Sequence, residues 1–261
     1  TATNQVNIGG STQDVRISEV YTLPKVDGSN GHVLTSNGSG VVSWAAASGG
    51  GSGADLYVAN ESSPSAQPTA AGANAIGIGD SAVASGTRSI AIGRGTASGW
   101  GAASFGHSGT SSGSYSIAMG ANSSGTGSIA SNGGAFAVSG GNASGGNSAA
   151  FGDAIATGTN SFAGQKTRAT GADSVAFANG NSGTSYGAQN AYAVSMGQNT
   201  KTSGRHGIAM GFVNQATGLQ SVAIGYGNSA THSQSFLLGG NISSTASNQV
   251  SIGGTQDYVR I

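Results

Sequence analysis

The stretch Ser89-Ile90-Ala91-Ile92-Gly93 decides the fold, because variants of it recur along most of the chain. The copies share a small first residue, and most of them have a large-small-large triplet and end in glycine. Copies lie at residues 75–79, 116–120, 148–152, 174–178, 207–211, 221–225 and 235–239. The closing glycines are evenly spaced, at 79, 93, 106 and 120, and then at 197, 211, 225, 239 and 253. A fixed short period of this kind indicates a repeat protein.

Each unit predicts two short strands and two turns. Side chains alternate between the two faces of a strand, so Ile90 and Ile92 share one face and Ala91 takes the other. Neither face carries a charge, and we expect both to be covered. The polar second half of each unit ends in another glycine, at 86, 99, 113, 127, 158, 171, 204 and 218. Two glycines per unit suit two tight corners with positive φ. The pattern therefore predicts an all-β fold, a parallel β-roll or solenoid whose coils stack about 4.8 Å apart.

One such coil is too thin to bury a core alone, because it offers only two or three medium-sized apolar side chains. The small Ala and Ser residues leave room for another chain to approach closely, so we expect an elongated homotrimer. The residues expected in the core of the roll or of the trimer are Ile78, Ile90, Ile92, Phe105, Ile117, Met119, Phe151, Phe177, Ile208, Met210, Val222, Ile224 and Leu238.

The repeated units resemble the head repeats of trimeric autotransporter adhesins, the YadA-like heads. The shared features are the serine, the apolar–alanine–apolar triplet, the glycine and the polar half that follows, and the resemblance covers residues 75–254. It implies a left-handed parallel β-roll, three intertwined chains and a head that binds host surfaces. Residues 140–147 depart from the pattern and are expected to form an irregular insertion.

Two features lie outside the repeats. Residues 23–44, with a hairpin predicted at the two-residue turn Asn37-Gly38, resemble connector modules of bacteriophage tail fibres. Residues 4–17 and 248–261 are near duplicates. We therefore expect one period of a modular fibre, and the alternative is a self-contained protein with two similar capping strands.

The expected domains follow from these features. They are 1–17, the terminal coil and exit strand of an upstream roll; 18–47, the hairpin connector; 48–74, a linker; 75–247, the β-roll head; and 248–261, a second terminal coil and exit strand.

Composition and motifs exclude several classes of function. Only 7% of residues are charged and the formal net charge is zero, so we expect no nucleic-acid partner. The absence of cysteine excludes disulfides and thiol chemistry, and no apolar run is long enough for membrane insertion. The four histidines are scattered, and Asp80, Asp153 and Asp173 occupy similar turns several coils apart. We therefore expect no enzyme, no metal and no cofactor.

Several aromatic and basic residues in or beside polar turns are candidates for receptor contact. Rigid rings next to Asn, Ser and Gly are typical of surfaces that stack against carbohydrate, and the sequence has one basic cluster. The candidates are Trp100, Tyr115, Tyr186, Tyr226, Lys201, Arg205 and His206. The alternative is that these side chains cover the corners of the roll or pack between protomers.

The sequence therefore predicts a non-enzymatic, extracellular fibrous protein that attaches to a cell-surface glycan or protein. Two settings stay open: the tail fibre of a phage virion and an autotransporter-like adhesin on a bacterial cell surface. A third possibility is a purely structural spacer, or a self-assembling extracellular filament subunit, with no ligand.

Overall fold

The structure is a computed structural model that describes residues 16–17, 21–24, 26, 28–46, 67–177 and 185–254. The chain forms two compact units, Thr1–Leu56 and Tyr57–Ile261. All regular secondary-structure elements in the described ranges are β-strands, and none is a helix. The predicted all-β class is therefore confirmed.

The first unit contains two antiparallel strand pairs. β1 (Arg16–Ile17) pairs with β2 (Tyr21–Thr22), and β3 (His32–Ser36) pairs with β4 (Val42–Ala46). The isolated bridge between Thr22 and Val41 links the two pairs.

The turn between β3 and β4 is longer than the sequence predicts. It spans residues 37–41, because Ser36 and Val42 are the last paired residues of the two strands. The side-chain oxygen of Asn37 accepts hydrogen bonds from the backbone N–H groups of Ser39 and Val41. The Asn-Gly signal therefore marks a hairpin at the right place, but Asn37 organises a longer loop and not a two-residue turn.

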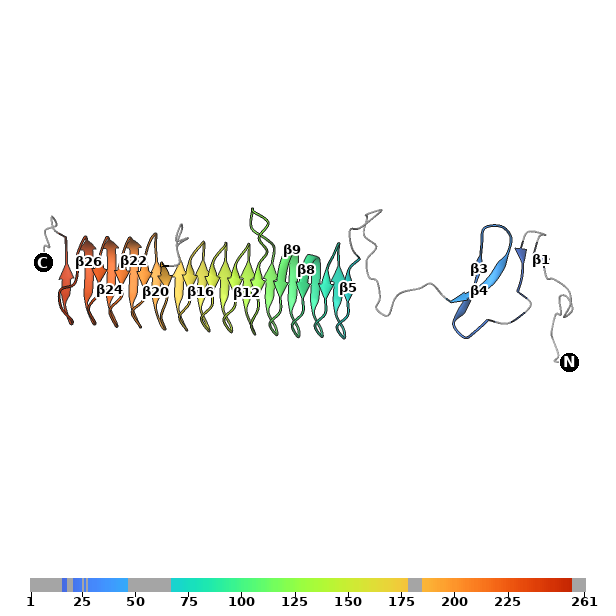
Figure 1. Cartoon of the computed structure of the whole chain (residues 1–261), viewed down its shortest axis with the longest axis horizontal. Helices are drawn as coiled ribbons and strands as arrows, with labels where there is room; N and C mark the ends of the chain where they lie inside the picture. The colour runs from blue at the N-terminus through green and yellow to red at the C-terminus, as the bar shows by residue number, and fades with distance from the viewer. Residues whose placement is uncertain are drawn as a thin grey trace. The chain divides into compact units, whose positions relative to one another are not determined.

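The second unit is a solenoid made of two parallel sheets (Figure 1). Sheet 1 takes the large-small-large triplets, and each of its strands pairs in parallel with the strand of the next coil. Its thirteen described strands are β6 (Ile76–Ile78), β8 (Ile90–Ala97), β9 (Ala103–Ser111), β10 (Ile117–Met119), β12 (Phe136–Val138), β14 (Ala149–Phe151), β16 (Phe162–Gly164), β18 (Val175–Phe177), β20 (Val194–Met196), β22 (Ile208–Phe212), β24 (Val222–Tyr226), β26 (Phe236–Gly240) and β27 (Val250–Ile252).

Sheet 2 takes the polar halves of the units. Its strands are β5 (Thr69–Ala70), β7 (Val83–Ala84), the last residues of β8 and β9, β11 (Ile129–Ala130), β13 (Asn142–Ala143), β15 (Ile155–Ala156), β17 (Arg168–Ala169), β19 (Gly187–Ala188), β21 (Lys201–Thr202), β23 (Gln215–Ala216) and β25 (Ser229–Ala230). The chain alternates between the two sheets, so each coil has one strand in each sheet and two corners. This is the predicted parallel β-solenoid.

The corner that leads from sheet 2 to sheet 1 is a two-residue turn, and these turns stack along one edge of the roll. The N–H of each second turn residue donates to the carbonyl of the first turn residue one coil earlier, as from Tyr115 to Trp100 at 2.8 Å. We call this edge the turn ridge. Its turns are residues 73–74, 87–88, 100–101, 114–115, 133–134, 146–147, 159–160, 172–173, 191–192, 205–206, 219–220, 233–234 and 247–248.

The opposite edge, where sheet 1 leads to sheet 2, begins at the closing glycines in most coils, and we call it the glycine corner. The ridge turns follow one another at nearly constant intervals in the sequence, except for two longer coils, from Tyr115 to Gly134 and from Asp173 to Tyr192. In the first long coil the extra residues form a small hairpin at the glycine corner, closed by a bridge between Ala121 and Gly127.

Two details of the predicted repeat are wrong. Residues 140–147 form no irregular insertion, because they contain β13 and a regular ridge turn at 146–147. Gly127 belongs to the small hairpin, and Asn132 takes the place before the ridge turn that glycine holds in most coils. The coils that follow are slightly shorter than those near the C-terminal end of the roll, which displaces the glycines from the expected period.

The interior of most coils is filled by alanine, and Ser104, Ser195 and Leu237 take the inward middle position in their own coils. Middle residues of sheet 1, such as Ala91 and Ala150, are fully buried, as are sheet 2 residues such as Ala156. Where a serine opens a unit, it also points inward. In Ser148 and Ser161 the hydroxyl donates to the carbonyl oxygen of Gly145 and Gly158, respectively, at 2.7 Å, so a buried polar group of the corner is satisfied.

The large residues of the triplets face outward from sheet 1 in two continuous columns. The first column is Ile76, Ile90, Ala103, Ile117, Phe136, Ala149, Phe162, Val175, Val194, Ile208, Val222, Phe236 and Val250. The second lies two residues further along each strand and includes Ile92 and Phe177, which are 37% and 44% exposed in the single chain. We call these the apolar columns.

All thirteen residues expected in the core of the roll or of the trimer lie in the apolar columns. In the single chain the interior is filled mostly by alanine and not by these larger side chains. The exception is Leu237 in β26, which is fully buried near the C-terminal end of the roll. Their burial between chains stays a prediction.

Candidate receptor-binding surfaces

The first aromatic cluster lies on the turn ridge and comes from three successive coils. The rings of Trp100 and Tyr115 meet edge to face, with centroids 4.6 Å apart. The guanidinium carbon of Arg88 lies 5.4 Å from the centroid of the Trp100 ring, within cation–π distance. Tyr115 is 63% exposed, so the cluster presents an aromatic surface beside a positive charge.

A second aromatic cluster lies further along the same ridge. The rings of Tyr192 and His206 stack with centroids 4.8 Å apart and an interplanar angle of 11°. The guanidinium carbon of Arg205 lies 5.9 Å from the centroid of the Tyr192 ring. The two clusters therefore share one composition, aromatic rings with an arginine beside them.

Between the two clusters the ridge carries a short ladder of amides and a carboxylate. Asn147 Nδ2 lies 3.4 Å from Asn160 Oδ1, and Asn160 Nδ2 donates to Asp173 Oδ1 at 3.0 Å. Each of these residues occupies the second position of its turn, where φ is positive. The ladder shows that ridge side chains one coil apart reach one another regularly.

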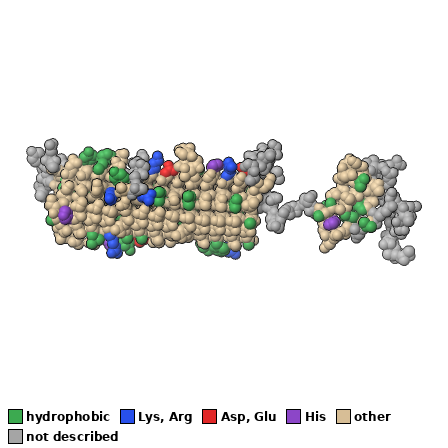
Figure 2. All heavy atoms as spheres, viewed as in Figure 1, with side chains coloured by type: hydrophobic (Ala, Val, Ile, Leu, Met, Phe, Trp, Pro, Cys, Tyr) green, Lys and Arg blue, Asp and Glu red, His purple; other side chains and the backbone are tan. Residues whose placement is uncertain are grey.

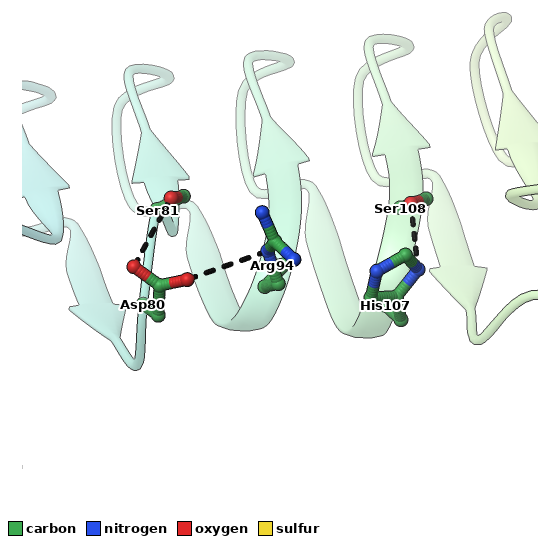
Figure 3. Close-up of polar contacts among 5 residues, drawn as sticks. All are labelled: Asp80, Ser81, Arg94, His107 and Ser108. Atoms are coloured by element: carbon green, nitrogen blue, oxygen red, sulfur yellow. Dashed lines mark hydrogen bonds and ion pairs between the residues drawn. The ribbon is translucent and has the colours of Figure 1, made fainter. Parts of the chain in front are cut away.

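The glycine corner carries a different set of stacked side chains. Asp80, Arg94 and His107 come from three successive coils and lie in a row (Figure 3). Asp80 Oδ2 lies 3.4 Å from Arg94 Nε, and the His107 ring nitrogen Nδ1 lies 2.7 Å from the Ser108 hydroxyl. The visible face of the roll has few charged side chains, and they are scattered (Figure 2).

Tyr226 also lies at the glycine corner, where its ring stacks on that of Phe212 with centroids 5.6 Å apart and an angle of 8°. Gly240 is the next residue in this column. Gly240 has no side chain, and the space beside it is open. The residue at this position therefore does not cover the second face of the Tyr226 ring.

The structure separates the predicted receptor-contact residues into four places. Trp100, Tyr115, Arg205 and His206 lie on the turn ridge, and Tyr226 lies at the glycine corner. Lys201 begins β21 in sheet 2, so the basic cluster of the sequence divides between a sheet and the ridge. Tyr186 is half-buried next to β19. Their contact with a receptor stays a prediction.

Sequence reasoning missed three members of these clusters: Arg88, Tyr192 and Phe212. Their position within the coil could have identified them, because each of them lies one coil away from an aromatic ring at the same edge of the roll. The three aspartates also divide between the two edges. Asp80 and Asp153 follow glycines at the glycine corner, whereas Asp173 lies on the turn ridge, so the expectation of similar turns is wrong for Asp173.

Metal-binding groups and membrane-spanning helices are both absent from the described part of the chain. No group of three or more His, Asp, Glu or Cys side chains in these ranges is placed to hold a metal ion. No helix among the same residues is long and apolar enough to cross a membrane.

Stacked short coils with aromatic side chains along both corners define a rigid repeat protein that displays side chains at fixed intervals. Residues 70–96, 188–212 and 216–241 match the family model for the YadA head domain repeat (2 copies). No curated protein matches the chain. The predicted resemblance of the repeats to YadA-like heads, an adhesin family, is confirmed in these three segments, which together cover less than half of the chain.

Proposed function

We propose that the chain is a segment of a homotrimeric, non-enzymatic attachment fibre that contacts a receptor on a cell surface. The observation that carries the proposal is the pair of apolar columns. They run through thirteen described strands of sheet 1 and span roughly 58 Å at about 4.8 Å per coil. Soluble monomers rarely leave a contiguous apolar patch of more than a few hundred Å² uncovered.

Other copies of the same chain are the natural cover for the apolar columns. Each copy presents the same columns at the same spacing, so packing them together buries apolar surface over the whole length of the roll. Burying one Ile, Val or Phe side chain fully contributes about 1.5–3 kcal/mol. The match to YadA head repeats favours three copies over two.

The head repeats favour a bacterial surface adhesin over a phage tail fibre, because the family match covers them and does not extend to the connector. The tail-fibre setting rests on the resemblance of residues 23–44 to connector modules. The proposed domain boundaries and the modular fibre stay part of this proposal. Genomic neighbours decide between the settings: an outer-membrane anchor and secretion signal, or baseplate and tail genes.

A binding assay separates attachment from a purely structural spacer. The purified segment is immobilised on beads and exposed to candidate host cells, with uncoated beads as the control. We expect the segment to retain cells, because both edges of the roll display rings and arginine to solvent. Failure to retain any cell type tested would favour the spacer.

A further inference from the structure

The second position of each ridge turn has a backbone conformation that most side chains avoid. Its φ lies between 52° and 60° in the described turns that have a non-glycine residue there. Asn, Asp and Gly tolerate this region best, and Asn74, Asn147 and Asn160 fit that preference. Arg88, Tyr115 and Tyr192 do not, and neither do Gln220 and Gln234. Bulky side chains held in an unfavourable conformation often mark functional sites, and here the arginine and the two tyrosines belong to the two aromatic clusters.

The first cluster combines the groups that recognise an acidic sugar. An exposed ring such as Tyr115 offers a flat apolar surface for the C–H face of a pyranose. The planar guanidinium of Arg88 can bind a carboxylate through two parallel hydrogen bonds. Among the described residues, Arg88 has no carboxylate within ion-pair distance, so its charge is available to a ligand.

The ridge turn next to Tyr115 has no side chains of its own. It is Gly133-Gly134, and the side-chain amide of Asn147 in the following coil lies over Gly134 in the place that a Cβ would take. The Tyr115 ring is therefore followed along the ridge by a side-chain amide, and successive coils lie about 4.8 Å apart. A glycan chain that runs along the ridge would meet a stacking surface and then a hydrogen-bonding amide.

The second cluster lies five coils beyond Tyr115, roughly 24 Å away at the same spacing. Tyr192, His206 and Arg205 repeat the combination of rings and guanidinium. Asp173 lies one coil before Tyr192 and places a negative charge near it. We therefore expect this cluster to contribute stacking more than charge recognition.

From this arrangement we infer that the turn ridge binds an extended acidic glycan, with an acidic sugar at Arg88, Trp100 and Tyr115 and a second stacking contact at Tyr192 and His206. The inference rests on the proposed attachment function and names its receptor chemistry. A carboxylate-bearing sugar is favoured over a neutral one because the first cluster supplies an arginine that has no carboxylate within ion-pair distance among the described residues.

The test uses the whole segment on an array of sialylated and uronic-acid oligosaccharides printed beside their carboxyl-reduced counterparts. We expect binding to acidic members and binding on the order of tenfold weaker after carboxyl reduction, since a hydrogen bond to a charged group is lost. Arg88→Asn and Tyr115→Asn should each weaken binding on the order of tenfold. Asn is compatible with the backbone because Asn74 and Asn147 hold the same position.

Matched controls lie outside the described clusters. Lys166→Asn removes a charge at another residue with positive φ, and Arg168→Asn removes a charge in β17; both should leave glycan binding unchanged. The inference would be overturned if neutral and acidic oligosaccharides bound equally well. It would also be overturned if Arg88→Asn and Tyr115→Asn left glycan binding unchanged. A change in oligomeric mass in Tyr115→Asn would also overturn it, because the ring would then pack between protomers.

The bead assay for cell attachment, run in parallel, keeps the two proposals separate. Attachment to cells without binding to any glycan would point to a protein receptor, so the glycan inference would fail while the attachment function stood. If the segment bound neither cells in the bead assay nor any glycan on the array, the proposed attachment function itself would be wrong.

Discussion

Ala149 and Ala150 are consecutive in β14, yet they lie on opposite sides of sheet 1. Ala149 lies in an apolar column between Phe136 and Phe162, half-exposed in the single chain. Ala150 points into the coil and is fully buried. The same alternation holds in every coil of the roll, so one residue of register decides whether a side chain meets the interior or a neighbouring chain.

This pair gives a matched test of the alanine interior. Ala150→Leu should destabilise the roll by about 1–3 kcal/mol, because three more carbon atoms would have to fit against the buried Ala137 and Ala163 of the neighbouring coils. Ala149→Leu should leave the melting temperature unchanged or raise it, since a larger apolar side chain fits between two phenylalanines. Thermal melting followed by circular dichroism compares the two. Equal destabilisation would show that the inward and outward faces are misassigned.

The glycine corner depends on glycine only where coils approach closely. A Cβ at Gly225, where φ is 123°, would lie 1.9 Å from the carbonyl oxygen of Gly239 in the next coil. Gly225→Ala should therefore cost more than about 2 kcal/mol. At Gly120 φ is also positive but nothing lies within 4 Å, so Gly120→Ala should cost only about 1 kcal/mol. Urea denaturation measures both, and similar values would contradict the close stacking of corners.

Two buried asparagines lock the last coils together. Asn214 Nδ2 donates to the carbonyls of Met210 and Gly225 at 2.6 Å, and its Oδ1 accepts from the backbone N–H of Asn228. Asn214→Ala would leave buried backbone groups without partners, at about 1–3 kcal/mol for each. The exposed neighbour Gln215 is the control, because Gln215→Ala should change stability by less than about 0.5 kcal/mol. Denaturation midpoints compare the stability of the two variants. If Asn214→Ala left the midpoint unchanged, the structural role of the Asn214 hydrogen bonds would be refuted.

A charge in an apolar column should prevent assembly. Ile92→Asp places a carboxylate among apolar side chains that we expect other copies to bury, and an unpaired buried charge is costly. Thr87→Asp, in the exposed ridge turn just before β8, adds the same charge outside the columns. Size-exclusion chromatography should show dissociation of the first variant and normal elution of the second. If Ile92→Asp eluted as a normal oligomer, the side chain at position 92 would have to face solvent in the assembly, which would contradict the prediction.

The repeat period predicted the solenoid, because a short unit with two turns and a triplet of alternating size has few other solutions. The sequence also separated Ile90 and Ile92 from Ala91. It could not say which face points inward, since both are apolar and larger side chains usually form the core. The spacing between the two sheets decides this, and spacing is a property of the stacked coils that no single unit displays.

The ridge clusters were only partly predictable for a similar reason. Trp100 and Tyr115 were conspicuous as aromatic residues in polar turns, but Arg88 is distant from Trp100 in the sequence and one coil away in space. Coil length varies along the roll, so a strictly fixed period assigns some residues to the wrong turn. In the sequence, this hides the proximity of Arg88 and Trp100. Tyr192 was missed because one of the two long coils precedes it.

The central claim is that the apolar columns are covered by two further copies of the chain. Multi-angle light scattering of the purified segment at micromolar concentration measures this directly. The expected mass is three times the 25.0 kDa of a single chain. A folded, stable species of 25.0 kDa, with the β-sheet signal of the intact roll, would contradict the claim.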